Sequence, residues 1–179
     1  MAEIRGKFIT LLCSLMGVYK TQQEEANEFV QLNTGKGFKE LEAEGWYDYD
    51  IYCELMSRYR SASLSKDRAM VTLGQKIYPT IRSTMGLPES LMDNLLGFLK
   101  FNEEVFKASI RGKEVAPMKF LTIEEGEVII QSLPPSDKYP ELHMRLYEGV
   151  YLGILELCRV KEKKVEVLDN FTYRITWSL

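Results

Sequence analysis

The sequence predicts an α+β fold, in which a helical N-terminal part with a long central helix precedes a β-β-α-β-β unit. Apolar residues recur at three- and four-residue spacing through most of residues 1–112, which is typical of amphipathic helices. After Pro117, two pairs of β-rich runs are each joined by turn-forming residues, as in hairpins. A helical run separates the two pairs. Two hairpins that flank a helix most economically form one four-stranded antiparallel sheet, with helices packed on a face.

Length and composition fit one folded domain. A chain of 179 residues buries about 70% of the surface that its unfolded form exposes, enough for a core without disulfides or metal. Hydrophobic residues make up 45% of the chain and charged residues 27%, as in ordinary folded domains. We therefore predict a single domain over residues 1–179, mainly helical in 1–112, with the sheet and one helix in 113–179.

The first part of the chain predicts three helices. Residues 6–19 carry a wide apolar face at helical spacing, so this helix belongs to the core. A polar, acid-rich helix over residues 22–32 ends at the turn-forming residues 33–37. A short helix over residues 38–43 follows.

Three longer helices complete the helical part. Residues 45–50 predict a turn that leads into an Asp-capped helix. Ser65 suits the N-cap of the next helix, which Pro79 should kink or end. The stop and start signals of residues 85–88 then precede the longest amphipathic run, residues 89–109, which we expect to be the central helix.

The C-terminal part predicts the sheet. Residues 118–123 and 128–133 form a first hairpin, and a helix covers residues 139–160. Residues 165–177 form a second hairpin that turns at residues 169–170.

Charge and cysteine usage exclude several classes of partner and cofactor. The net charge is −3, and no basic block could neutralise several phosphates, so we expect no nucleic-acid partner. Cys13, Cys53 and Cys158 are far apart in sequence and form no C-x-x-C pair, which predicts buried thiols. No segment approaches the roughly 20 apolar residues of a membrane span. The N-terminus lacks a signal-peptide pattern, which favours the cytoplasm.

Short motifs of glycines and aromatic residues occur in a fixed order along nearly the whole chain. They are Arg5-Gly6-Lys7-Phe8, Gly45-Trp46-Tyr47-Asp48-Tyr49, Leu73-Gly74 with Ile77-Tyr78, Thr84-Met85-Gly86, Glu148-Gly149 with Gly153, and Tyr173-Arg174-Ile175-Thr176-Trp177. In this order the chain resembles the superfamily of heme nitric-oxide/oxygen-binding (H-NOX) domains, which includes 4-vinyl reductase domains and small TRAPP subunits. It is most similar to an uncharacterised bacterial, heme-less branch of that superfamily.

The resemblance also implies that heme is not bound in the usual way. Heme-binding members have a proximal histidine on the long helix, in a segment similar to residues 103–106, and Phe106 stands at the histidine position. An apolar ring cannot donate a lone pair to iron. Their Tyr-x-Ser-x-Arg run, which holds the heme propionates, is absent; the matching stretch is residues 133–137, where Asp137 would repel a propionate. We therefore expect no cofactor and no metal.

The same resemblance implies a place for a ligand. Leu95, Leu99 and Phe106 of the long helix would face Leu146 and Val150 of the last helix, where heme-binding relatives keep their pocket. A sealed core is favoured over an open cavity for these side chains. An open cavity would suit a flat or greasy ligand.

No set of residues predicts catalysis. His143 is the only histidine, and a structural or surface role is favoured over a pH-sensitive or axial-ligand role. The turn at residues 33–37 lacks the spacing of a phosphate-binding loop. The carboxylates of Asp48 and Asp50, and those of residues 124–127, are explained by a capped turn and a hairpin loop.

Two functions fit these sequence features best. The first is a non-catalytic sensory or regulatory domain without heme, which binds a small apolar ligand or a partner protein and signals through a second component. The alternative is an interaction module similar to the TRAPP subunits, which dimerises and scaffolds partners through its helical face. A closed apolar cavity would favour the first, and an exposed apolar surface would favour the second. An enzyme, the third hypothesis, rests on the 4-vinyl reductase analogy alone, and fold analogy does not establish function.

Overall fold

The computed structural model describes residues 1–84, 86–113, 115–169 and 171–178. Its helices are α1 (Gly6–Leu15), α2 (Lys20–Thr34), α3 (Tyr49–Ala62), α4 (Asp67–Thr84), α5 (Leu95–Ser109) and α6 (Pro140–Leu157). Its strands are β1 (Glu3–Arg5), β2 (Trp46–Asp48), β3 (Ile110–Arg111), β4 (Lys119–Glu124), β5 (Glu127–Gln131), β6 (Lys161–Val167) and β7 (Thr172–Ser178). Short 3₁₀ turns lie at Met16–Val18, Phe38–Glu40 and Glu89–Leu91. The α+β class is confirmed.

The two predicted hairpins form one four-stranded antiparallel sheet in the order β4-β5-β7-β6. Strand β5 pairs with β7, with Ile130 opposite Tyr173, and so joins the hairpins edge to edge. The buried apolar side chains of these two central strands, Val128, Ile130, Tyr173 and Ile175, lie on one face of the sheet. On that face the Tyr173 hydroxyl donates a hydrogen bond of 2.9 Å to the Met144 carbonyl oxygen of α6. Residue 170, in the predicted turn between β6 and β7, lies outside the described residues, as does Met85.

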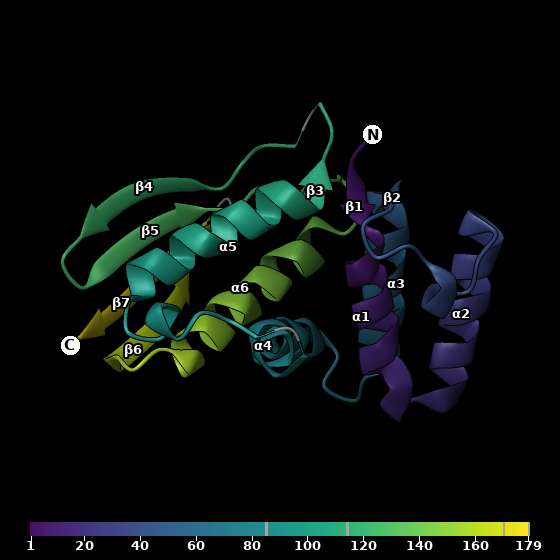
Figure 1. Cartoon of the computed structure of the whole chain (residues 1–179), viewed down its shortest axis with the longest axis horizontal. Helices are drawn as coiled ribbons and strands as arrows, with labels where there is room; N and C mark the ends of the chain where they lie inside the picture. Colours follow the sequence, from purple (N-terminus) through teal and green to yellow (C-terminus); the bar gives the residue numbers. More distant parts are fainter. Residues whose placement is uncertain (85, 114, 170, 179) are drawn as a thin grey trace.

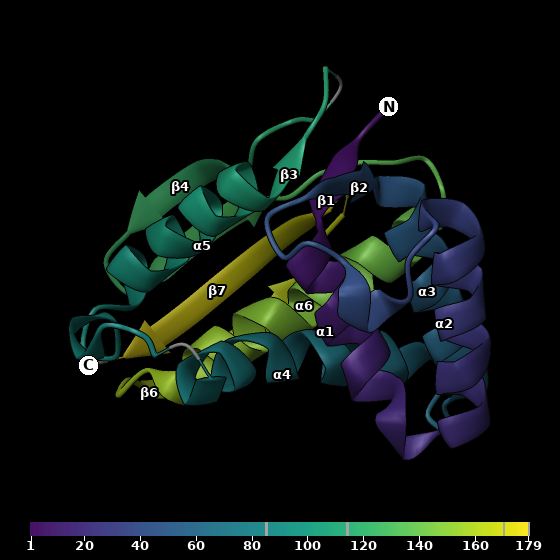
Figure 2. The same cartoon turned by 45° about the vertical axis from the view of Figure 1, so that its right-hand side comes forward.

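The helices gather at two ends of the molecule. Figures 1 and 2 show α1, α2 and α3 grouped at one end, and the sheet with α5 and α6 at the other. Helix α4 packs along α6. No helix in the described ranges is long and apolar enough to cross a membrane.

A second, three-stranded sheet was not predicted. Strands β2, β1 and β3 pair antiparallel, with the buried Ile4 opposite both Tyr47 and Ile110. Residues 46–48 therefore form a strand, where the sequence predicted only a turn. These strands have two or three residues, too few for an alternating pattern to show. The predicted Asp cap is present, because the Asp48 carboxylate accepts a hydrogen bond of 2.9 Å from the Asp50 backbone.

Several helices differ from their predicted bounds: α1 ends at Leu15 and not at residue 19, and the short helix predicted over residues 38–43 is only the 3₁₀ turn Phe38–Glu40. The central helix α5 begins at Leu95, not at residue 89, because the Asn94 side chain caps it by accepting a hydrogen bond of 2.9 Å from the Gly97 backbone. At 15 residues it is shorter than α4 and α6, which have 18 each. Pro79 does not end α4, which continues to Thr84.

Helices α4 and α6 touch backbone to backbone at three glycines. A Cβ added at Gly74 would overlap the Leu146 carbonyl oxygen and lie 2.8 Å from the Val150 nitrogen. At Gly149 it would overlap the Val71 carbonyl oxygen, and at Gly153 it would lie 2.5 Å from the Gln75 carbonyl oxygen. The glycines of the sequence motifs thus permit an approach that no other residue allows.

The three cysteines are free and buried, as the sequence predicted. Burial raises the pKa of the Cys13 and Cys53 thiols to about 12 and that of Cys158 to about 11. Because the thiolate is the reactive form, we expect a thiol reagent at pH 8 to label the native protein slowly and the urea-unfolded protein at once. Labelling of one cysteine at the unfolded rate under native conditions would contradict this burial.

Candidate functional site

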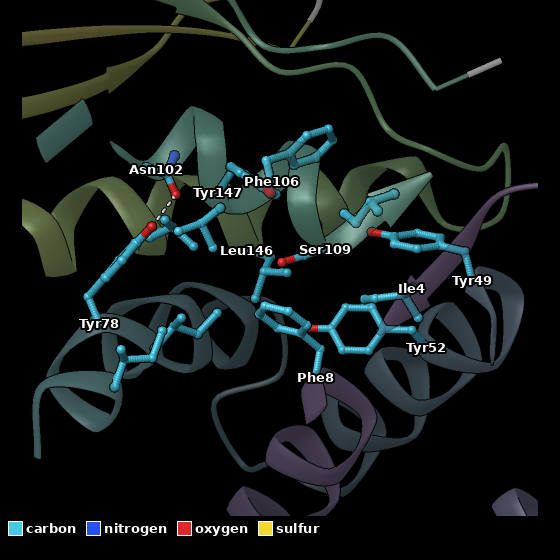
Figure 3. A pocket seen from close by; sticks show the side chains of 15 residues that line it. Ile4, Phe8, Tyr49, Tyr52, Tyr78, Asn102, Phe106, Ser109, Leu146 and Tyr147 are labelled. Carbon is cyan, nitrogen blue, oxygen red and sulfur yellow. Dashed lines mark hydrogen bonds between the residues drawn. The ribbon is translucent and has the colours of Figure 1, made fainter. Parts of the chain in front are cut away.

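A small cavity lies inside the molecule where α1, α3, α4, α5 and α6 meet (Figure 3). Its volume is about 50 Å³. A buried water occupies roughly 10–15 Å³ on this measure, so the cavity holds a few small atoms or one small group. Its walls include Phe8 from α1, Tyr78 from α4, and Leu146 from α6. The cavity therefore joins elements from both ends of the molecule.

The residues predicted to line a pocket fall into two groups. Phe106, Leu146 and Val150 line the cavity. Leu95 and Leu99 are buried but do not line it. The α5 side chains of the cavity wall come from the second half of that helix, about two to four turns beyond Leu95. The spacing of apolar residues predicts which side of a helix is buried. It does not predict which turns along the helix line a cavity.

Sequence reasoning missed the polar part of the cavity wall. The Tyr78 hydroxyl donates a hydrogen bond of 2.8 Å to Asn102 Oδ1, and Asn102 Nδ2 lies 3.4 Å from Met118 Sδ. Asn102 and Ser109 are buried polar residues of α5. Both lie on the same helical face as Phe106, four residues before it and three after, so a signal was present: two polar residues on an apolar face.

Three hydroxyls turn toward the cavity (Figure 3), those of Tyr49, Tyr52 and Ser109. The Tyr49 hydroxyl lies 3.4 Å from His143 Nδ1. Those of Tyr52 and Ser109 have no hydrogen-bond partner among the residues that the structure describes. Burial raises the pKa of Tyr49, Tyr52 and Tyr78, which keeps these phenols neutral. The site thus offers uncharged hydrogen-bonding groups in an apolar wall.

His143 has a structural place next to the cavity. It is 2% exposed, and its ring lies 4.6 Å from the Tyr147 ring, centre to centre. Its Nε2 lies 3.5 Å from the Ser132 hydroxyl. Burial lowers the pKa of His143 from 6.5 to about 3, although a hydrogen bond with the Ser132 backbone acts to raise it. The ring is therefore neutral at physiological pH. The sequence left open whether His143 has a structural role or lies on the surface. The structure shows that it is buried and has a structural role.

An open groove of about 620 Å³ lies outside the cavity, between α1, the end of α4, residues 86–88 and α5. Its apolar lining includes Leu11, Leu87 and Phe101. Lys7 lies at its edge and pairs with Glu44, with 2.8 Å between Nζ and the carboxylate oxygen.

The other candidate motifs have local structural roles. Gly35, at a φ of 75°, ends α2; the predicted turn is therefore confined to residues 35–37, because residues 33 and 34 still belong to the helix. Arg174 pairs with Glu127, and Lys138 pairs with Asp50 at 3.0 Å. Within the described ranges, no three His, Cys, Asp or Glu side chains gather as metal ligands would.

Comparison with solved structures gives one type of fold. The chain is similar to an Fe(II) unliganded H-NOX protein mutant from K. algicida, with a TM-score of 0.64 and 15% identity over 98% of this chain and 97% of that one. It is also similar to a mutant H-NOX of T. tengcongensis, with a TM-score of 0.62 and 14% identity over 98% of both chains. No protein-family model and no curated protein matches the sequence. The chain therefore has the H-NOX-like fold over nearly its whole length, as the sequence motifs predicted.

Proposed function

We propose that this chain is a non-catalytic, ligand-binding regulatory domain of the H-NOX-like fold that works without heme. The internal cavity is the observation that carries the proposal. Its wall joins Phe8 of the N-terminal helices to Leu146 of α6, so an occupant would change the packing between the two ends of the molecule. A ligand that fits one arrangement better than another shifts the population toward it, which is the basis of sensing.

The residues at the site do not fit a heme group. Phe106 lies in the cavity wall, where its ring packs edge-on against Tyr147 at 6.0 Å and offers no ligand atom to iron. The cavity volume of about 50 Å³ is also far below the roughly 300–1,000 Å³ of pockets that enclose ligands of drug size.

The segment before α6 supports the same proposal. The resemblance assigns the grip on heme propionates to this stretch. Here the Ser136 hydroxyl donates a hydrogen bond of 2.7 Å to Asp50 Oδ1, and the Lys138 ammonium lies 3.0 Å from Asp50 Oδ2. The serine and the lysine of this stretch are thus already bonded to a carboxylate of the chain itself.

The titratable groups support a non-catalytic role. A general base works best with a pKa near the operating pH, whereas burial takes the pKa of His143 to about 3. Nucleophilic cysteines have lowered pKa values, whereas burial raises that of Cys53 to about 12. The lowered pKa of His143 and the raised pKa of Cys53 thus make the histidine a weak base and leave the thiol protonated.

The test is to incubate the purified protein with hemin and record its absorption spectrum and native mass spectrum. We expect no Soret band of bound heme and no one-to-one heme mass. The Phe106→His variant, treated in the same way, shows whether the missing ligand atom is the only obstacle. A one-to-one complex of the unaltered protein with heme would overturn the heme-free proposal.

A scaffold module like the TRAPP subunits is the second candidate, and the open apolar groove is the observation that favours it. The scaffold hypothesis predicts that the same native mass spectra show a dimer, in which the second copy covers the groove. A Leu11→Glu substitution would then restore the monomer, since a charge cannot be buried there without a partner. If the protein is a monomer at all concentrations, the hypothesis that it dimerises through this groove is wrong.

A further inference from the structure

The cavity and the groove are adjacent and share part of their lining. Five residues line both of them: Phe8, Tyr78, Ile81, Val105 and Ser109. A single layer of side chains from α1, α4 and α5 therefore separates the interior from the open groove. Side chains in such a layer change rotamer far more easily than a backbone moves. A molecule in the groove needs only these rotations to extend into the cavity.

The inner end of this site has unused hydrogen-bonding capacity. The side chains of Ser109 and Tyr52 are 3% and 5% exposed, and both hydroxyls face the cavity (Figure 3). Neither has a partner among the described residues. Buried hydroxyls usually have one, supplied by the protein, by water or by a ligand. By contrast, Tyr78 and Asn102 already bond to each other at 2.8 Å.

The inner end also selects against charge. The described lining of the cavity contains no acidic or basic side chain. Burial raises the pKa of Tyr52 and Tyr147, so these phenols carry no charge either. Because an ionised group buried without a counter-charge is strongly disfavoured, the group that enters must be neutral.

The outer end is suited to an apolar chain. Leu11, Leu87, Pro88 and Phe101 line the groove, and its one described charged residue, Lys7, is paired with Glu44. A bound molecule would thus have its polar group inside and its hydrocarbon part along α1 and α5. This is the reverse of a surface-bound detergent, whose polar head faces water.

We propose that the combined site binds an uncharged, elongated amphiphile such as a medium-chain alcohol. Its hydroxyl hydrogen-bonds to Ser109 and Tyr52, and its alkyl chain lies in the groove. The inference rests on the proposed ligand-binding function and adds the chemical class and the direction of binding.

The experiment is isothermal titration of the full chain with 1-octanol, 1-hexanol and 1-butanol, and with octanoate at pH 7.5 as the charged counterpart. We expect one-to-one binding whose affinity rises about fourfold per added methylene, as each leaves water. Octanoate should bind at least about tenfold more weakly than 1-octanol, because its charge must be buried. Ser109→Ala and Tyr52→Phe should each weaken octanol binding about three- to tenfold.

Two controls separate the possible failures. Ser83→Ala, on the exposed last turn of α4, should leave the affinity unchanged. Toluene, an apolar probe without a hydrogen-bonding group, is titrated alongside. Equal binding of octanol and octanoate, or no effect of Ser109→Ala and Tyr52→Phe together, would overturn the proposed chemistry. If toluene binds and the alcohols do not, the class is wrong but ligand binding stands. If no probe binds, both proposals fail.

Discussion

Gly149→Ala should lower the free energy of unfolding by about 3 kcal/mol, at the upper end of the cost of overpacking a core. The new methyl group would overlap the Val71 carbonyl oxygen and lie 2.8 Å from its carbonyl carbon. These neighbours are backbone atoms of α4, which no rotamer change can move. The loss of about 3 kcal/mol is the net value, after the helix propensity of alanine has contributed about 1 kcal/mol in its favour. Urea denaturation followed by circular dichroism measures the difference.

Gly17→Ala is the matched control. A Cβ at Gly17 would meet only the end of the Gln23 side chain, at 3.3 Å, which can rotate away. Its effect should stay within about 0.5 kcal/mol. A Gly149→Ala protein as stable as the Gly17→Ala protein would mean that α4 and α6 are not in backbone contact. The same contact fixes the site, because Gly74 of α4 abuts the backbone of Leu146 and Val150, whose side chains line the cavity.

Periodicity predicted most of the fold. The apolar spacing of α1, α3 and α4, and the β-rich composition of β5 and β7, are local properties of the chain. Strands β1, β2 and β3 could not be predicted in this way. Their pairing depends on residues 41–45 and 106–108 positions apart, and a run of three residues has no period.

The candidate site could be predicted only in part. Phe106, Leu146 and Val150 were placed by a resemblance in sequence order, and they do line the cavity. The hydroxyls of Tyr52 and Ser109 were not found, because their convergence depends on how α3 and α5 approach each other in three dimensions. The spacing of residues within one helix carries no information about that approach.

Stability should fall by about 2 kcal/mol between pH 7 and pH 5 because of His143 alone. In the unfolded chain this histidine takes up a proton near pH 6.5, whereas in the folded protein burial holds its pKa at about 3. Between these values the unfolded state binds more protons, so acid favours unfolding by about 1.4 kcal/mol per pH unit. The contribution of neutral His143 to the free energy of unfolding is complete above pH 6.5 and is lost progressively as the pH falls toward 3. The carboxylates contribute little above pH 5, since their usual pKa values lie near 4.

His143→Gln isolates this contribution. The variant keeps a neutral hydrogen-bonding side chain beside Tyr49 and Ser132 but cannot take up a proton in this range. Its stability at pH 7 should be lower, because the ring contact with Tyr147 is lost. The decisive quantity is the difference between pH 7 and pH 5, which urea denaturation at each pH gives for both proteins. A buried neutral histidine requires this difference to be about 2 kcal/mol larger in the unaltered chain, and equal pH dependence in both would place His143 in contact with water.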